Sequence, residues 1–128
     1  MSKVPDDLRY TKEHEWIQEI TPTKFRIGIT DFAQGELGDI VYVEVDTLDE
    51  NLDIEEVFGT VEAVKTVSDL FLPVSGEIIE FNDSLEDEPE KVNTDPYGAG
   101  WMIKVEMKDA AEANALMIAA DYKVLIGH

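Results

Sequence analysis

Lys65 is the residue of this sequence whose position best suits chemistry. It follows a segment rich in β-branched residues, Val57–Val64, and precedes a second apolar segment, Leu70–Val74. The residues Lys65–Asp69 between them are short and polar enough to form a turn. We therefore expect a β-hairpin, ending near Gly76, that presents the Lys65 amine near its tip. Most turn lysines are only solvated charges, so a further role needs support from neighbouring residues.

Such support comes from the residues around Lys65. It is the only cation between Arg26 and Lys91, and the carboxylates of Glu62 and Asp69 lie close to it in sequence. Gly59 and Gly76 lie on either side, where backbones can approach closely or bend. The pattern favours a presented amine over an ordinary ion-pair cluster.

Independent catalysis is hard to build from the remaining residues. The chain has no cysteine, which excludes disulfides, thiolate catalysis and cysteine-ligated zinc. Its two histidines are His14 and His128, and no glycine-rich loop follows a strand in P-loop or Rossmann form. We therefore expect a protein that catalyses nothing by itself. Any redox sulfur must be borrowed from a cofactor.

The charge of the chain argues against two classes of partner, nucleic acids and anionic membranes. With 29 acids against 10 bases, its formal net charge is −19, whereas nucleic acids and anionic membranes are bound through cations. The charge suits transient docking on basic patches of partner proteins, and it equally suits solubility alone. MSKVPDDLRY lacks an apolar secretory core, and no apolar run approaches the roughly 20 residues that span a bilayer. We expect a cytoplasmic protein.

Alternation and capping signals predict the elements that hold the hairpin. Strands are expected over 15–20, 25–29, 40–45 and 101–106, with Val41, Val43 and Val45 on one face of the third. Thr30 or Asp31 can cap a short helix that stops by Gly38, and Asp31 with Gln34 matches a capping box. A C-terminal helix over about 109–126 is expected from an apolar stripe with three-to-four spacing: Ala113, Leu116, Met117, Ala120 and Val124.

A weak internal repeat suggests how these elements are arranged. Gly38–Val43 resembles Gly76–Phe81, and each is followed by an acidic segment and then another strand. Two such half-units around the hairpin predict a mainly β (α+β) fold, a quasi-two-fold sandwich or flattened barrel, in one domain over 1–128.

The acidic loop 46–56 is the first place to look for a metal. Asp49, Asn51 and Asp53 have the one-three-five spacing of an EF-hand. However, Ile54 stands where that motif needs glycine and Thr60 where it needs glutamate. We expect a solvated loop and no metal site.

The hairpin carries a family resemblance. It is similar to the lipoyl-lysine motif of the glycine cleavage system H-protein family in these residues: Gly59, Glu62, Ala63, Val64, Lys65, Ser68, Asp69, Pro73, Val74, Ser75 and Gly76. Lipoyl domains of 2-oxo acid dehydrogenases and biotinyl carriers share the looser glycine–lysine–glycine pattern. Biotinyl carriers typically set the lysine between methionines, where this chain has Val64 and Thr66.

The resemblance to the H-protein family covers nearly the whole chain, from Leu8 to Gly127. The further matching blocks are Tyr10–Trp16, Gly28–Asp31 with Ala33 and Gln34, Leu37–Val41 with Val43 and Glu44, Asn93 with Asp95–Gly98, Gly100–Met102, and Tyr122. Generic lipoyl domains share neither the HEW segment nor the C-terminal helix. The acidic loop departs from the family because it lacks the glycine often found there.

The resemblance implies a lipoyl/biotinyl-type fold and a non-catalytic carrier with lipoic acid joined to Lys65 by an amide. The implied partners are the glycine decarboxylase P protein, the aminomethyltransferase T protein, the dihydrolipoamide dehydrogenase L protein, and a lipoate ligase or lipoyl-transfer enzyme. A groove containing Glu15, with Asp69 and Glu62 assisting, is expected to shelter the loaded arm of a monomeric carrier. His14 is expected to alternate with Glu15 and to pack or cap.

Two other functions stay open on the sequence. One is a lipoyl carrier of the same fold that serves another oxidoreductase assembly, for example in sulfur metabolism. The other is an unmodified acidic interaction module.

Overall fold

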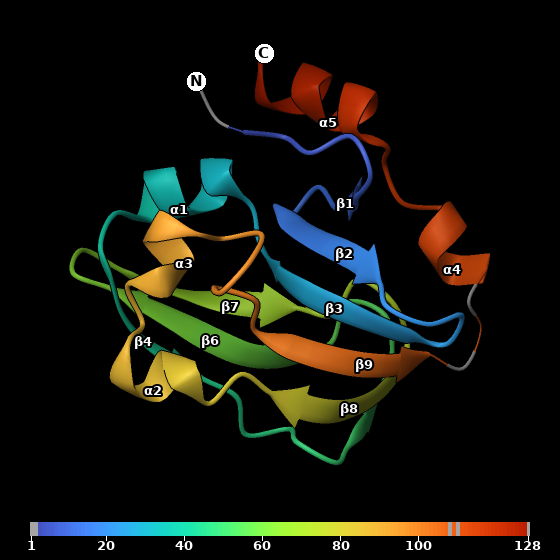
Figure 1. Ribbon diagram of the computed structural model, residues 1–128, viewed down its shortest axis with the longest axis horizontal. Coiled ribbons are helices and arrows are strands. Elements are labelled where there is room, and N and C mark those ends of the chain that lie inside the picture. The colour runs from blue at the N-terminus through green and yellow to red at the C-terminus, as the bar shows by residue number, and fades with distance from the viewer. Residues whose placement is uncertain (1–2, 108, 110, 128) are drawn as a thin grey trace.

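Two antiparallel sheets form the protein, and the computed structural model describes residues 3–107, 109 and 111–127 (Figure 1). The strands are β1 (Arg9–Tyr10), β2 (Glu15–Glu19), β3 (Lys24–Ile29), β4 (Ile40–Glu44), β5 (Asn51–Leu52), β6 (Val57–Ala63), β7 (Val67–Phe71), β8 (Gly76–Phe81) and β9 (Ile103–Met107). The helices are α1 (Asp31–Leu37), α2 (Ser84–Asp87), α3 (Lys91–Thr94), α4 (Ala111–Asn114) and α5 (Ala119–Ile126).

The two sheets differ in size. One has six strands in the order β1-β2-β3-β9-β8-β5, and the other has three in the order β4-β6-β7. Within the described ranges, no helix is long and apolar enough to cross a membrane.

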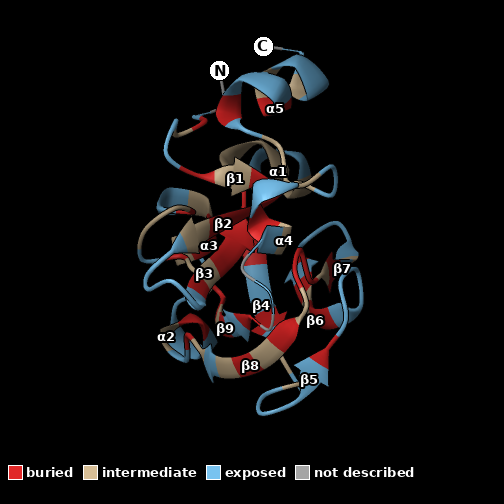
Figure 2. Ribbon diagram, turned by 90° about the vertical axis from the view of Figure 1, so that its right-hand side faces the viewer, coloured by how far each residue is buried: buried red, intermediate tan, exposed pale blue. Residues whose placement is uncertain are grey.

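The main core lies where the two sheets face each other. Alternate residues of the strands point inward, so Ile27 and Val105 of the larger sheet join Val61 and Leu70 of the smaller one in a single buried cluster. Figure 2 shows these buried stretches on the strands, while the loops are largely exposed. Burial of each such side chain contributes about 1.5–3 kcal/mol, so the sandwich is held mainly by this layer.

The internal repeat is visible in the strand pairing. β4 pairs with β6 and β8 pairs with β9, both antiparallel. Each pair shifts register at the same place in the repeat, between Ile40 and Tyr42 in one and between Ile78 and Glu80 in the other. An extra residue in one strand increases the local twist, so both half-units bend alike.

The bulge also overturns the expected face of β4. Val41 is 45% exposed, whereas Val43 is buried. From Ile40 to Tyr42 the strand β4 advances by two residues while its partner β6 advances by one. The alternation predicted for Val41, Val43 and Val45 therefore fails at Val41.

Helix α1 begins one residue after its cap. Thr30 is the N-cap, because its Oγ1 accepts a hydrogen bond from Ala33 N at 3.1 Å. The predicted capping box of Asp31 and Gln34 is replaced by a side-chain bond, in which Gln34 Nε2 donates to Asp31 Oδ1. Gly38 ends the helix with φ = 84°, a conformation that favours glycine.

The single C-terminal helix expected over about 109–126 is wrong. The described residues there form α4 and α5, separated by a segment in which Met117 forms a β-bridge to Tyr10. Both backbone bonds of that bridge are short, 2.9 and 3.0 Å. Strand-like pairing therefore replaces the helix at Met117, and the predicted apolar stripe does not hold, since Val124 is 78% exposed.

A second, smaller apolar cluster lies beneath α5. The rings of Tyr10 and Tyr122 stack with centroids 4.7 Å apart, and both side chains are fully buried. Trp16 adds its indole from β2 and donates to Pro96 O at 3.0 Å. Through this cluster, the C-terminal helix packs on the strands that begin the larger sheet.

Candidate functional site: a lysine hairpin and the adjoining cavity

Lys65 lies at the tip of the hairpin formed by β6 and β7. Ala63 N donates to Thr66 O at 2.8 Å, which closes a turn over Val64 and Lys65. The turn is tighter than predicted, because β7 begins at Val67 rather than at Leu70. The hairpin itself ends at Phe71, and Gly76 opens the next strand, β8.

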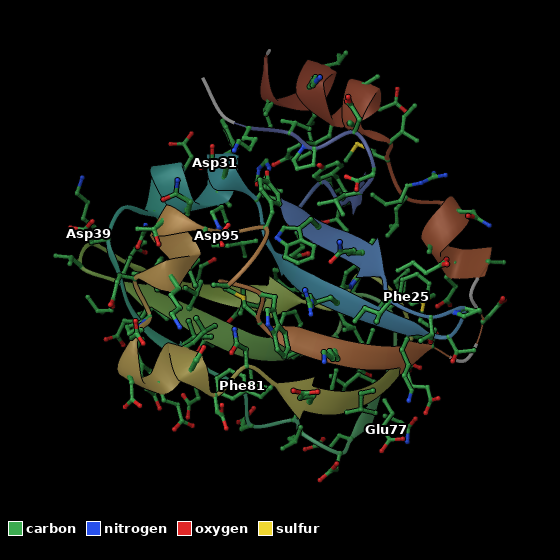
Figure 3. All side chains as sticks on the ribbon, viewed as in Figure 1. Phe25, Asp31, Asp39, Glu77, Phe81 and Asp95 are labelled. Carbon is green, nitrogen blue, oxygen red and sulfur yellow. The ribbon has the colours of Figure 1, made fainter. Side chains whose placement is uncertain are left out.

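A neighbouring loop supports this tip. Val64 N donates to Asp39 O at 3.1 Å, and Figure 3 places Asp39 beside the protruding turn. Lys65 itself is exposed, and none of the ion pairs within the described residues includes it. Lys65 is therefore held on a supported turn with its side chain exposed to solvent.

The base of the hairpin is packed against β4. A Cβ atom at Gly59 would lie 2.4 Å from Glu44 O, a distance that side chains do not reach. Gly59 thus allows two backbones to approach closely, which fixes the hairpin on the sandwich.

Glu15 is the most unusual titratable group near the hairpin. It is 2% exposed, and its Oε1 and Oε2 accept hydrogen bonds from Thr11 Oγ1 at 3.0 Å and from Phe71 N at 3.1 Å. Burial raises the pKa of Glu15 to about 8, although these two hydrogen bonds lower it. No cation pairs with it among the described residues, so the carboxyl is largely neutral at pH 7.

A cavity of about 250 Å³ lies between α1, β7 and the start of β2. It is lined by Glu13, His14, Glu15, Ile29, Phe32, Ala33, Glu36, Leu37, Val61, Ser68, Asp69 and Leu70. Asp69 is four residues from Lys65, a span of about 13 Å along a strand. A long arm on Lys65 could therefore fold back into this cavity.

The structure brings two of the three predicted groove residues together. Glu15 and Asp69 both line this cavity. Glu62 is exposed on the outer face of β6, opposite Tyr42 and Val67, and it is not among the lining residues. The roles of all three in sheltering an arm stay predictions.

His14 also lines the cavity, which alternation along a strand did not predict. It precedes β2 and has φ = 69°, a left-handed conformation that is uncommon outside glycine. This backbone turn lets three consecutive residues, Glu13 to Glu15, border one cavity. His14 packs as well, since its ring lies 5.0 Å from that of Phe32.

Glu15 also borders a second cavity, of about 310 Å³, on its other side. This cavity is more apolar, with Leu72, Pro73, Leu116 and Met117 in its walls. Along β7 its lining starts at Phe71, six residues and about 20 Å from Lys65, whereas that of the first cavity starts at Ser68, three residues and about 10 Å away, so the first cavity is the nearer one along the strand.

The fold and the site together define a class of protein. A β-sandwich with two similar half-units presents an exposed lysine at a hairpin tip, near a cavity that contains carboxyl groups. This is the arrangement of a lipoyl/biotinyl-type carrier, which offers an amine to be modified and has no catalytic apparatus of its own.

Comparisons with known proteins narrow the class to one family. The family model for the glycine cleavage H-protein matches residues 8–128. The chain is 58% identical over 125 residues to a glycine cleavage system H protein of Chlorobium limicola, covering 97% of this chain and 98% of the relative. It is 52% identical over 126 residues to one of Halalkalibacterium halodurans, covering 98% of each.

A solved structure agrees with these relatives. The crystal structure of a glycine cleavage system H protein from Mycobacterium marinum superposes with a TM-score of 0.88 at 38% identity, covering 98% of this chain and 100% of the other. The chain therefore belongs to the glycine cleavage H-protein family.

Membership of the family confirms the predicted fold and function. The protein is the lipoyl-carrier component of the glycine cleavage system, a non-catalytic subunit, and its family carries a lipoyl group. The comparisons thus favour glycine cleavage over another oxidoreductase assembly and over an unmodified interaction module.

Proposed function

We propose that Lys65 is the lipoyl attachment site, joined to lipoic acid through an amide. The observation that carries the proposal is the exposed amine at a turn closed by Ala63 and Thr66 and supported by Asp39, with no ion pair to it among the residues that the structure describes. An amine held in this way is accessible to an attaching enzyme, and the flanking strands limit where its root can move. When bound, lipoic acid supplies the disulfide chemistry that a chain without cysteine lacks.

The residues of the chain fit such an arm. The cavity beside β7 has apolar walls from Ile29, Leu37 and Leu70, and carboxyl groups from Glu15 and Asp69. Apolar walls suit the hydrocarbon part of the arm, and carboxyl groups suit an amine carried at its end. We propose that Glu15 and Asp69 hold that amine between visits to the partner enzymes.

The protonation state of Glu15 can change when the arm carries an amine. Without a cation nearby, burial keeps it protonated at neutral pH because its pKa is about 8. A protonated amine placed beside it favours the carboxylate form, so loading would release the Glu15 proton. The cavity would thereby avoid an unpaired buried charge in both states.

The proposed partners are those of the glycine cleavage system. The P protein loads the aminomethyl group of glycine, the T protein accepts it, the L protein reoxidises the dithiol, and a lipoate ligase or lipoyl-transfer enzyme attaches the cofactor. Tethering the arm raises its effective concentration at each active site. We include in the proposal one carrier domain over residues 1–128, a monomeric state and a cytoplasmic location, which light scattering and cell fractionation test.

The glycine–bicarbonate exchange reaction with P protein tests the proposal. Lipoylated wild-type protein should support exchange, and Lys65→Arg prepared in the same way should not, because its guanidinium keeps the charge but forms no lipoyl amide. The exposed position of Lys65 makes a folding defect in this variant unexpected. Exchange by Lys65→Arg at the wild-type rate would refute the attachment site.

A further inference from the structure

Tyr122 connects the C-terminal helix to the cavity beside Lys65. Its hydroxyl lies 2.9 Å from His14 Nδ1 and 2.7 Å from Thr30 Oγ1. Tyr122 and Thr30 are both fully buried, so neither hydroxyl can turn to solvent for a partner. His14 lines the cavity, and Thr30 caps α1, which forms another of its walls.

The direction of these hydrogen bonds follows from counting protons. Thr30 Oγ1 already accepts from Ala33 N, and its own proton has one acceptor within reach among the described residues, the Tyr122 oxygen. The Tyr122 proton is then donated to His14 Nδ1. If instead His14 Nδ1 donated to Tyr122 and Tyr122 donated to Thr30, the Thr30 proton would be buried without an acceptor, which costs about 1–3 kcal/mol.

Donation from Thr30 to Tyr122 and from Tyr122 to His14 fixes the tautomer of His14. Because Nδ1 accepts from Tyr122, the neutral ring carries its proton on Nε2. Nε2 makes no hydrogen bond within the described residues and is not among their buried, unpartnered atoms, so it is open to the cavity or to solvent. A protonated His14 ring would be a donor at Nδ1 as well, so Tyr122 could no longer donate to it. Burial likewise lowers the pKa of His14, against the raising effect of Glu13 and Glu36.

We propose that His14 is a positioning residue that presents an Nε2–H donor to the sheltered arm, with its tautomer fixed by the relay from Thr30 through Tyr122. Its counterpart on the arm is an uncharged hydrogen-bond acceptor, the amide oxygen of the arm, because the carried amine is protonated and has no lone pair to offer. The carboxyl groups of Glu15, Asp69, Glu13 and Glu36 around the same cavity suit a cation, and His14 adds the complementary donor. This inference rests on the proposed sheltering of the arm in this cavity.

The first test uses the unmodified full chain, so it does not depend on the arm. Long-range ¹⁵N–¹H correlation spectra report the tautomer of each of the two histidines, and His14→Gln assigns the signals. We expect His14 to be protonated on Nε2. In Tyr122→Phe the two tautomers should mix, because Nδ1 loses the donor that fixes its state. A ring protonated on Nδ1 in the wild type would overturn the proposal.

Tyr10→Phe is the matched control. Tyr10 stacks on Tyr122 and also loses one hydroxyl, but that hydroxyl donates to Pro5 O and does not reach His14. The control should leave the tautomer of His14 unchanged. An equal effect of both variants would show that the aromatic packing, and not the relay, controls His14, and would overturn the proposal.

The second test uses lipoylated protein before and after loading by P protein. The amide oxygen is the acceptor in either case: an Nε2 shift on lipoylation indicates that the arm enters the cavity before loading, and one that appears only on loading indicates that only the loaded arm is sheltered. The loaded arm should decay up to about twofold faster in Tyr122→Phe than in Tyr10→Phe, because mixed tautomers leave His14 with an Nε2–H donor about half of the time. An unchanged Nε2 signal in both states would overturn the role of His14, even if exchange activity confirmed Lys65 as the attachment site.

Discussion

Phe71 N donates to Glu15 Oε2 at 3.1 Å, so a carboxyl from the larger sheet caps the free edge of β7 in the smaller one. The edge of a sheet normally leaves backbone donors unpaired. Here one of them is satisfied by the buried group that also borders the cavity next to Lys65. This single contact ties the position of the hairpin to the protonation of Glu15.

Glu15 should make the stability of the protein depend on pH. Its folded-state pKa, about 8, lies above its ordinary value of 4.5, so the folded state binds more protons between those values. Stability therefore falls as the pH rises through this window, by up to about 1.4 kcal/mol per pH unit. Glu15→Gln removes this slope. Urea unfolding of the wild type and of Glu15→Gln at pH 5, 6.5 and 8 measures the slope. The same dependence of the unfolding free energy on pH in both proteins would contradict a raised pKa of Glu15.

Asp69 and Glu62 should differ in their effect on the loaded arm. Both are acids on the hairpin, but only Asp69 lines the cavity. Asp69→Asn should shorten the lifetime of the aminomethylated arm by up to roughly fivefold, the effect of losing an ion pair of about 1 kcal/mol at an exposed carboxylate, and Glu62→Gln should leave it unchanged. Release of formaldehyde and ammonia over time gives the lifetimes. Equal lifetimes for Asp69→Asn and the wild type would remove Asp69 from the shelter.

Gly59 should tolerate no side chain. In Gly59→Ala the new Cβ meets Glu44 O at 2.4 Å, so the hairpin base must shift, at a cost of about 1–3 kcal/mol. Gly35→Ala is the control, because nothing lies within 4 Å of its Cβ position and alanine favours the helix by about 0.5–1 kcal/mol. Chemical unfolding should show changes of opposite sign, and a neutral Gly59→Ala would refute the close approach.

Glu112 should fasten α4 to the segment after the hairpin. Its Oε1 accepts from both Ser75 N and Ser75 Oγ at 2.8 Å. Glu112→Ala leaves both donors without this acceptor and should cost about 1–2 kcal/mol, whereas Glu112→Gln keeps an acceptor oxygen and should cost less. Amide exchange across α4 and Ser75 measures the loss, and equal protection in all three proteins would show that the contact contributes nothing.

Local pattern was sufficient to predict much of the sandwich. The β-branched alternation in 57–64 and 25–29 predicts β6 and β3 closely, and Gly38 predicts the end of α1. The position of Lys65 at the hairpin tip also follows from local signals, because a polar run between two apolar runs has few other solutions.

The remaining features depend on contacts between distant residues. The bulge at Ile40 and Tyr42 and the short strand β5 within the acidic loop exist only through pairing with other strands. The break before α5 arises because Met117 pairs with Tyr10, more than a hundred residues away. The left-handed conformation of His14 places it on the cavity wall, and no local signal in the sequence indicates that conformation.

The most direct test of the account is the mass of the protein after coexpression with a lipoate ligase and lipoic acid. We predict one added lipoyl group, located on Lys65 by peptide mapping, and an unmodified mass for Lys65→Arg made in the same cells. A lipoyl group on another lysine, or a wild-type protein that stays unmodified beside a lipoylated H protein from a relative, would contradict it.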